Sequence, residues 1–159
     1  MAGGPYPAFS AIPVTSARTF PNIVTGNGEK GMGVEASVGA DSIWRLRFQL
    51  PGTLPTGTCK LLLVTRAAAA TGNAKVNPKW ASVAALESPD AASLQAEGTT
   101  TIAWTTGYDA SNGVYVVTKI TLDADTPVAG EIIAMDLTFE TASWTLAARS
   151  TWQAFVIFE

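Results

Sequence analysis

The chain has no histidine and one cysteine, and charged residues make up 14% of its 159 residues, against about 25% in an average globular protein. Without histidine, no side chain has an ordinary pKa close to neutrality for general acid–base catalysis. A lone Cys59 excludes an intrachain disulfide and a cysteine-based metal site, and a catalytic thiolate or serine would lack its histidine partner. We therefore expect no enzyme, with no catalytic residue, no cofactor and no metal.

The charges are also scattered singly along the sequence. Ten basic and thirteen acidic residues give a net charge of −3, without the lysine and arginine patch that neutralises phosphates. The N-terminus lacks the features of a signal peptide, and no long apolar stretch is free of glycine, proline and charge. We expect no nucleic acid partner, no membrane partner, and synthesis in a cytoplasm.

Three weak motifs have structural readings. Gly26, Gly28 and Gly31 have the spacing of a dinucleotide loop, but the residues that follow favour a strand over the required helix. Carboxylates that could pair for glycoside hydrolysis lie in a turn or on the wet side of a strand, outside any predicted cleft: Asp123 with Asp125, and Asp136 with Glu140. Oxygen ligands for calcium are present in turns, without a complete ligand loop: Asp109, Asn112, Asp123 and Asp125.

Most of the sequence predicts short strands, which are separated by turns rich in glycine, proline, asparagine and aspartate. In residues 43–50, Trp44, Leu46, Phe48 and Leu50 alternate with polar side chains, so one face is buried and Arg45, Arg47 and Gln49 lie on the wet face. Residues 131–140 alternate in the same way, and we expect Ile133, Leu137 and Phe139 in the core. The pattern predicts a β-sandwich or barrel.

Two segments depart from plain alternation. Ser88 as N-cap, Pro89 at the first helical position and Gly98 as a stop predict one short helix over residues 89–97. A strand over residues 73–83 contains Pro78, which predicts an interruption or an edge position.

Residues 1–28 form a separate compositional block. Four prolines favour extended backbone, while the block also carries large apolar side chains that a solvated linker normally lacks. We expect an extended N-terminal arm, residues 1–28, lying on its own body or on a neighbour, followed by a sandwich domain, residues 29–159.

The tryptophans have two interpretations. Trp80, Trp104, Trp144 and Trp152 fill a core or an interface, or they form a platform on which sugars stack. The second interpretation makes a carbohydrate-binding module the alternative function.

From residue 40 onward the order of these patterns resembles the single jelly-roll structural proteins of tailed bacteriophages. The resemblance lies in the strand of residues 44–51, the hairpin of residues 57–63, the small-residue stretch 67–75, and the closing segments 129–137 and 147–158. It implies an all-β jelly-roll-like antiparallel β-sandwich with one short helix and the N-terminal arm. It supplies no catalytic or ligand residue.

The resemblance also implies a function. Such proteins include capsid decoration (cement) proteins on the capsid surface of the virion, and others in tails, portals or appendages. The expected partners are the major capsid protein or another virion protein, with a homotrimer as the expected assembly. The arm and the last strand supply the expected interface residues: Tyr6, Phe9, Ile12, Val14, Phe20, Trp152, Phe155 and Phe158.

Overall fold

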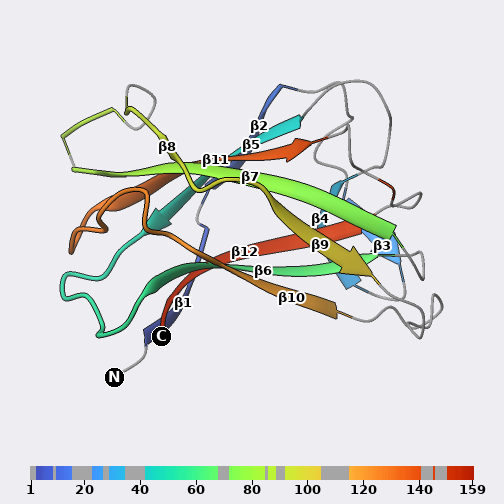
Figure 1. The fold of residues 1–159 in the computed structure, drawn as a ribbon, viewed down its shortest axis with the longest axis horizontal. Helices are drawn as coiled ribbons and strands as arrows, with labels where there is room; N and C mark the ends of the chain where they lie inside the picture. The colour runs from blue at the N-terminus through green and yellow to red at the C-terminus, as the bar shows by residue number, and fades with distance from the viewer. Residues whose placement is uncertain are drawn as a thin grey trace.

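The computed structural model has two antiparallel sheets packed face to face, which confirms the predicted all-β, jelly-roll-like sandwich (Figure 1). It describes residues 3–8, 10–15, 23–26, 29–34, 42–67, 72–84, 86–88, 92–104, 115–140, 145 and 150–159. Within those ranges every regular element is a strand. No helix among them is long and apolar enough to cross a membrane.

Sheet A has the strand order β10-β6-β12-β4-β3, and β1 pairs with β12 beside β4. Its strands are β1 (Gly3–Pro7), β3 (Ile23–Gly26), β4 (Glu29–Val34), β6 (Cys59–Ala67), β10 (Tyr115–Thr121) and β12 (Ser150–Phe158). The last strand, β12, therefore lies inside the sheet, with β6 on one side and β4 and β1 on the other.

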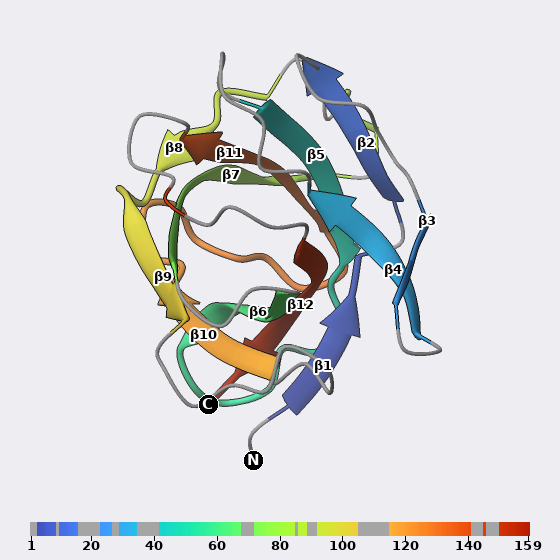
Figure 2. The same cartoon turned by 90° about the vertical axis from the view of Figure 1, so that its right-hand side faces the viewer.

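Sheet B has the order β2-β5-β11-β7-β8, and β9 also pairs with β7. Its strands are β2 (Ser10–Thr15), β5 (Ser42–Gln49), β7 (Gly72–Val83), β8 (Gln95–Ala96), β9 (Thr100–Trp104) and β11 (Ile132–Glu140). Seen along the sandwich, β9 lies on one side, next to β10 of the other sheet (Figure 2).

The core between the sheets contains the side chains that alternation placed there. Trp44, Leu46, Phe48, Ile133, Leu137 and Phe139 are all buried, as predicted. Sheet A contributes the inner residues of β6 and β12, including Leu61, Leu63, Trp152 and Val156. Cys59 is buried among them as a small apolar group, also as predicted.

The predicted helix over residues 89–97 is wrong. Gln95 and Ala96 form β8 and pair with Trp80 and Lys79 of β7. A helix of that length has little stability of its own, so tertiary contacts decide the conformation of this segment. Here Leu94 packs on the outer side of sheet B, and Glu97 accepts hydrogen bonds from the Trp80 indole and from Ala124 N, the latter at 2.9 Å.

Pro78 neither ends nor interrupts β7. It pairs with Leu137 of β11 on one side, and on the other side it lies between β8 and β9, which pair with β7 separately. The Pro78 carbonyl accepts from Glu97 N at 3.0 Å on that second side. A residue's N and C=O point to the same side of a strand, so the missing N–H lies where the neighbouring strand is broken.

The segment predicted as an arm belongs to its own body wherever it is described. β1 lies in sheet A against β12, and β2 lies in sheet B against β5. The hairpin of β3 and β4 pairs residues 23–26 with residues 29–32 across the predicted boundary at residue 28. The chain therefore enters both sheets within its first fifteen residues.

Candidate functional site

The outer side of sheet A carries a row of apolar side chains on adjacent strands. Strand alternation directs residues 61, 63, 154 and 156 inward, so their neighbours in β6 and β12 point outward. We call the outward set the sheet A outer face. Its apolar members are Pro7, Leu62, Val64, Val117, Phe155 and Ile157.

These side chains lie in register across four strands. Pro7 of β1 is opposite Phe155 of β12, Phe155 is opposite Leu62 of β6, and Leu62 is opposite Lys119 of β10. One step along, Gln153, Val64 and Val117 form the next row. Val117 is 56% exposed, so the apolar surface extends onto β10.

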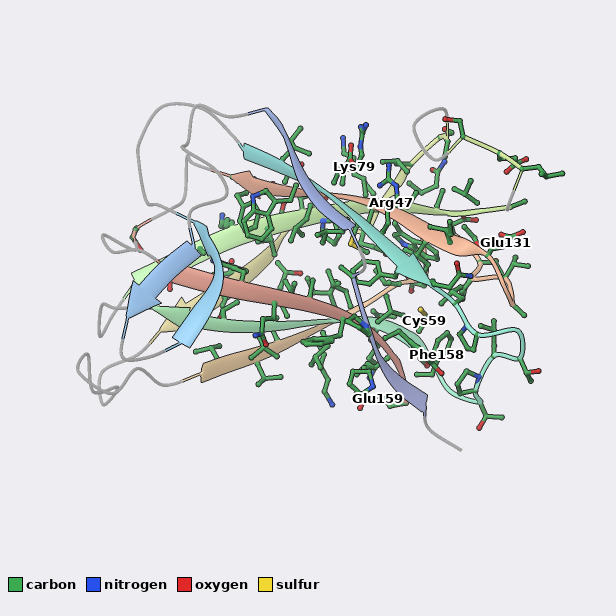
Figure 3. The ribbon with its side chains drawn as sticks, turned by 180° about the vertical axis from the view of Figure 1, so that it is seen from behind. Arg47, Cys59, Lys79, Glu131, Phe158 and Glu159 are labelled. Atoms are coloured by element: carbon green, nitrogen blue, oxygen red, sulfur yellow. The ribbon has the colours of Figure 1, made fainter. Side chains whose placement is uncertain are left out.

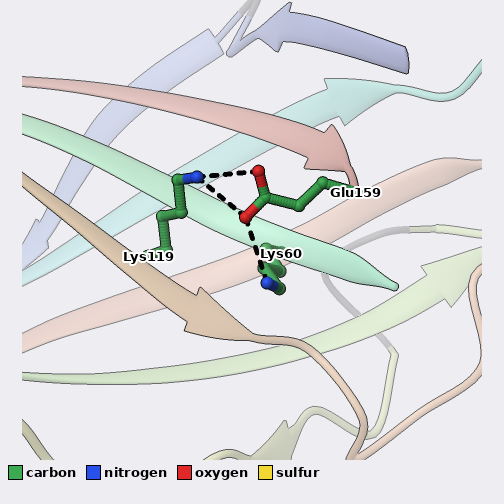
Figure 4. Close-up of polar contacts among 3 residues, drawn as sticks. All are labelled: Lys60, Lys119 and Glu159. Atoms are coloured by element: carbon green, nitrogen blue, oxygen red, sulfur yellow. Dashed lines mark hydrogen bonds and ion pairs between the residues drawn. The ribbon is translucent and has the colours of Figure 1, made fainter. Parts of the chain in front are cut away.

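A three-residue ion cluster borders this face (Figure 4). Lys119 Nζ donates to both carboxylate oxygens of Glu159, at 2.8 and 2.7 Å, and Lys60 Nζ donates to Oε1 at 3.0 Å. The hydrogen bond from Lys119, followed by that from Lys60, lowers the pKa of Glu159. One carboxylate thus serves two lysines, and the charge on the border of the face is small.

The predicted interface residues divide between the inside and the outside of the sandwich. Trp152 and Phe158 point into the core, at 1% and 2% exposed, so neither is available to a partner. Phe155, on the same strand, is half-buried on the sheet A outer face. β12 is apolar on both sides, and sequence alternation could not say which side is inner.

The remaining interface predictions lie in the N-terminal segment. Tyr6 is half-buried and packs edge-on against Phe158 of its own chain, with ring centroids 6.3 Å apart. Ile12 and Val14 belong to β2, whose backbone alone is described. Phe9 and Phe20 lie outside the described residues.

Sheet B differs on its outer side. Arg47, predicted to be wet, is 8% exposed and donates to Leu46 O at 2.9 Å. Beyond it, a small apolar cluster of Ala81, Val83 and Ala134 is packed against Ala92 and Leu94. Arg45 and Asp136 pair through two hydrogen bonds, at 3.0 and 3.1 Å. Arg47 and Lys79 lie on this outer side (Figure 3).

The carboxylates at one end of the sandwich bind backbone and hydroxyl groups. Asp125 accepts from Ser82 N at 3.0 Å and from Thr126 N at 2.8 Å, as a turn aspartate does. Glu131 accepts from Ser82 Oγ at 2.7 Å, and the same Oγ accepts from Val128 N at 3.1 Å. These bonds fix the loop between β10 and β11.

A shallow depression of about 510 Å³ opens beside this loop. Its lining is Ala81, Ser82, Glu87, Ser88, Ala92, Ser93 and Asp125. Both carboxylates are engaged, because Glu87 accepts from Ala84 N at 3.4 Å. The lining offers no aromatic ring on which a sugar could stack, and its Ser82 hydroxyl already donates to Glu131.

The described residues bear on both the calcium hypothesis and the tryptophan-platform hypothesis. No group of three or more acidic or cysteine side chains that could hold a metal occurs within the described ranges; Asp109 and Asn112 fall outside them. Trp80 and Trp152 are buried in the core, so the platform cannot include them. Trp104 is described in backbone only, and Trp144 is not described.

Comparisons with known proteins show that the fold of this chain is distantly similar to several solved structures. No family model and no curated protein sequence matches this chain. Two family 11 carbohydrate-binding modules of Clostridium thermocellum are 10% identical, with TM-scores of 0.48 and 0.46; the alignments cover 98% and 94% of this chain and 92% and 86% of theirs. An arabinose-bound α-L-arabinofuranosidase is 13% identical over 97% of this chain, at a TM-score of 0.49, and the chain spans 25% of its length. Such values carry no argument about function.

Proposed function

We propose that this chain is a non-enzymatic structural protein of a tailed-phage virion, a decoration or cement protein that packs against a neighbouring virion protein through the sheet A outer face. The observation that carries the proposal is that face, where Leu62, Val64, Phe155 and Ile157 point outward from central strands. An antiparallel sheet usually has polar residues on its solvent side. A contiguous apolar outer side is typical of a protein contact.

The rest of the molecule suits a passive role. Its buried tryptophan and phenylalanine side chains stabilise the core, and the described carboxylates at the loop end bind backbone or hydroxyl groups. Covering the face contributes about 25 cal/mol per Å² of apolar area, before the costs of association. Many copies on a closed lattice then add their weak contacts into one strong attachment.

Particles that lack the protein provide the test. Purified protein is added back, and attachment and the heat resistance of the particles are measured. We expect the wild type to attach in many copies and to raise the temperature of genome release. Phe155→Ser should attach poorly, while Thr101→Ser on exposed β9 of the opposite sheet should attach normally. Equal attachment of both variants would contradict the proposal.

A carbohydrate-binding module is the second candidate. One observation favours it: the half-buried ring of Phe155 lies in register between Pro7 and Leu62, with Gln153 two residues along on the same face. Sugars stack on aromatic rings beside hydrogen-bonding groups. Binding of glycans to the wild type, lost in Phe155→Ser, would support this function over the first.

The proposed absence of catalysis has its own test. With no histidine, the attached protein should stabilise particles evenly between about pH 6 and 8, where few of its groups titrate. A sharp loss near neutrality, or turnover of glycan or peptide substrates by the pure protein, would reveal a site that this proposal lacks.

A further inference from the structure

We propose that β1 is an exchangeable strand, and that the side of β12 which it covers accepts residues 3–8 of a second copy of this chain in place of its own. We call this side the receiving edge; it consists of residues 154–158 of β12 and of Pro55 beside them. The inference concerns the pairing of one strand with β12, and it does not rest on the proposed function.

Few contacts hold β1 on its own body. Two of its five residues, Pro5 and Pro7, have no N–H to donate, and none of the five is fully buried. Among the described strands β1 pairs with β12 alone, and the register shifts between Gly3 and Tyr6. β12 pairs with β6 along its whole length, so the receiving edge does not depend on β1 for its position. Such a strand opens locally at a smaller free energy than the whole fold.

The receiving edge requires glycine at two successive positions. A Cβ added at Gly3 would lie 2.1 Å from Pro55 Cγ. At Gly4, whose φ is +111°, an added Cβ would lie 3.0 Å from Val156 O. Pro55 has little freedom to withdraw, because the adjacent Leu54 packs against the core. A strand with side chains at these two positions would therefore collide with the edge.

The next contacts select the residues that follow the glycines. Tyr6 packs edge-on against Phe158, with ring centroids 6.3 Å apart. Ala8 packs against the core, and its N donates to Ala154 O at 3.3 Å. A matching strand thus needs two glycines followed by an aromatic ring and a small residue at fixed spacing. Two successive glycines occur once in the sequence, at residues 3 and 4, so the segment that fits is the same segment of another copy.

The exchange changes few contacts. The strand of a second copy makes the same bonds as the strand that it replaces, so the entropy of association is the main cost. The chain's own β1 competes at an effective concentration on the order of millimolar, which copies held close together also reach. Exchange of an identical element is for this reason a low-cost route from single chains to assemblies.

A disulfide between two differently tagged chains tests the exchange. Because Ala8 N donates to Ala154 O, the adjacent Pro7 and Phe155 form a pair without backbone hydrogen bonds, in which side chains approach closely. A mixture of Pro7→Cys chains with Phe155→Cys chains should therefore crosslink under mild oxidation. The native Cys59 is buried, and burial raises the pKa of its thiol to about 12, so it should not compete.

Gln153→Cys is the matched control for the second chain. Gln153 is exposed on the same strand and the same side as Phe155, and it lies two residues out of register with Pro7. Exchange should leave this variant uncrosslinked with Pro7→Cys. Collision of two outer faces would crosslink it as readily as Phe155→Cys, and that result would overturn the proposal.

The decisive measurement places one further substitution, Gly3→Ala, in either member of the mixture. In the Pro7→Cys chain it blocks the donated strand, and the rate of crosslinking should fall by about tenfold or more. In the Phe155→Cys chain it removes the competing strand, so the rate should instead rise by about tenfold or more. Equal effects in the two chains, or no effect in either, would contradict the exchange.

A synthetic peptide of residues 1–8 gives a second measurement, in chains that keep both glycines. At millimolar concentration it should slow the crosslinking of Pro7→Cys with Phe155→Cys, whereas the same peptide with alanine at positions 3 and 4 should not. Circular dichroism of the Gly3→Ala chains should show an intact sandwich, because no residue of β1 is fully buried. Failure of the unmodified peptide to compete would also overturn the proposal.

Discussion

Phe139 of sheet B packs edge-on against Trp152 of sheet A, with ring centroids 5.0 Å apart and ring planes at 83°. Trp44 lies against the same phenyl ring at 4.8 Å. These three rings join the sheets at the centre of the core, where edge-to-face pairs stabilise beyond the area that they bury. Phe139 therefore links the aromatic packing of one sheet to that of the other.

Replacing Phe139 by alanine should lower the free energy of unfolding by about 3–5 kcal/mol, through lost contacts and a cavity beside two indole rings. Urea titration followed by tryptophan fluorescence measures it. Phe155→Ala, on the outer face, removes the same atoms from a half-buried position and should lower it by about 1 kcal/mol or less. Equal losses in the two variants would mean that the inner and outer sides have been assigned wrongly.

Gly57 should not tolerate alanine. Its φ is +130°, and an added Cβ would lie 2.8 Å from the backbone N of Glu159. Gly57→Ala should destabilise the protein by about 1–3 kcal/mol. Gly130→Ala, with φ +77° and open space, measures the backbone effect alone, and Gly52→Ala, which meets nothing within 4 Å, should be neutral. Thermal unfolding of the three variants should therefore rank them in that order, and an undisturbed Gly57→Ala would contradict the close approach.

The ionisation of Glu159 should make the stability of the folded protein depend on pH in the acid range. Its pKa is lowered below the ordinary 4.5, first by the hydrogen bond from Lys119 and then by that from Lys60. A lowered folded-state pKa contributes stability above the ordinary value, and the contribution disappears as the pH falls through the folded value. The melting temperature of the wild type should thus decline more than that of Glu159→Gln below pH 4.5. Parallel curves for the two proteins would rule out this contribution.

Cys59 should be inert in the folded protein. Burial, and secondarily the negative charge of Glu97, raises the pKa of its thiol to about 12. Because the thiolate is the reactive form, an aromatic disulfide reagent at about pH 8 should label Cys59 only after denaturant is added. Cys59→Ser in denaturant is the blank. Rapid labelling of the native protein would show that the end of β6 opens readily.

The sequence could predict the strands that have one wet side, and little about those that have none. β5 and β11 alternate clearly, so Trp44, Phe48 and Phe139 were assigned to the core correctly. β6 and β12 are apolar at consecutive positions, and only the packing of the two sheets shows that Trp152 is inner and Phe155 outer. The surface proposed as functional therefore lies on the strands whose orientation the pattern leaves undetermined.

Long-range pairing explains the other differences. The capping signals at Ser88 and Pro89 are local, whereas β8 is fixed by Trp80 and by the loop that contains Ala124. Similarly, Arg47 occupies a polar position in the alternation of β5. It is nevertheless buried, because it lies beside Ala134 of an apolar cluster that Leu94 covers. Contacts between residues far apart in sequence outweigh local propensity in each case.

The cover that Ala92 and Leu94 form over sheet B has a consequence for growth. Among the described side chains, the outer side of sheet B has its own apolar cover and paired charges such as Arg45 with Asp136, whereas the outer side of sheet A presents Leu62 and Phe155 without such a cover. A protein with a single binding side has no side left for a further copy once that side is occupied. If the protein attaches to its partner through the sheet A outer face as proposed, stacking through the broad sides should end at one layer, because the described outer side of sheet B offers no second apolar surface from which a fibre could grow.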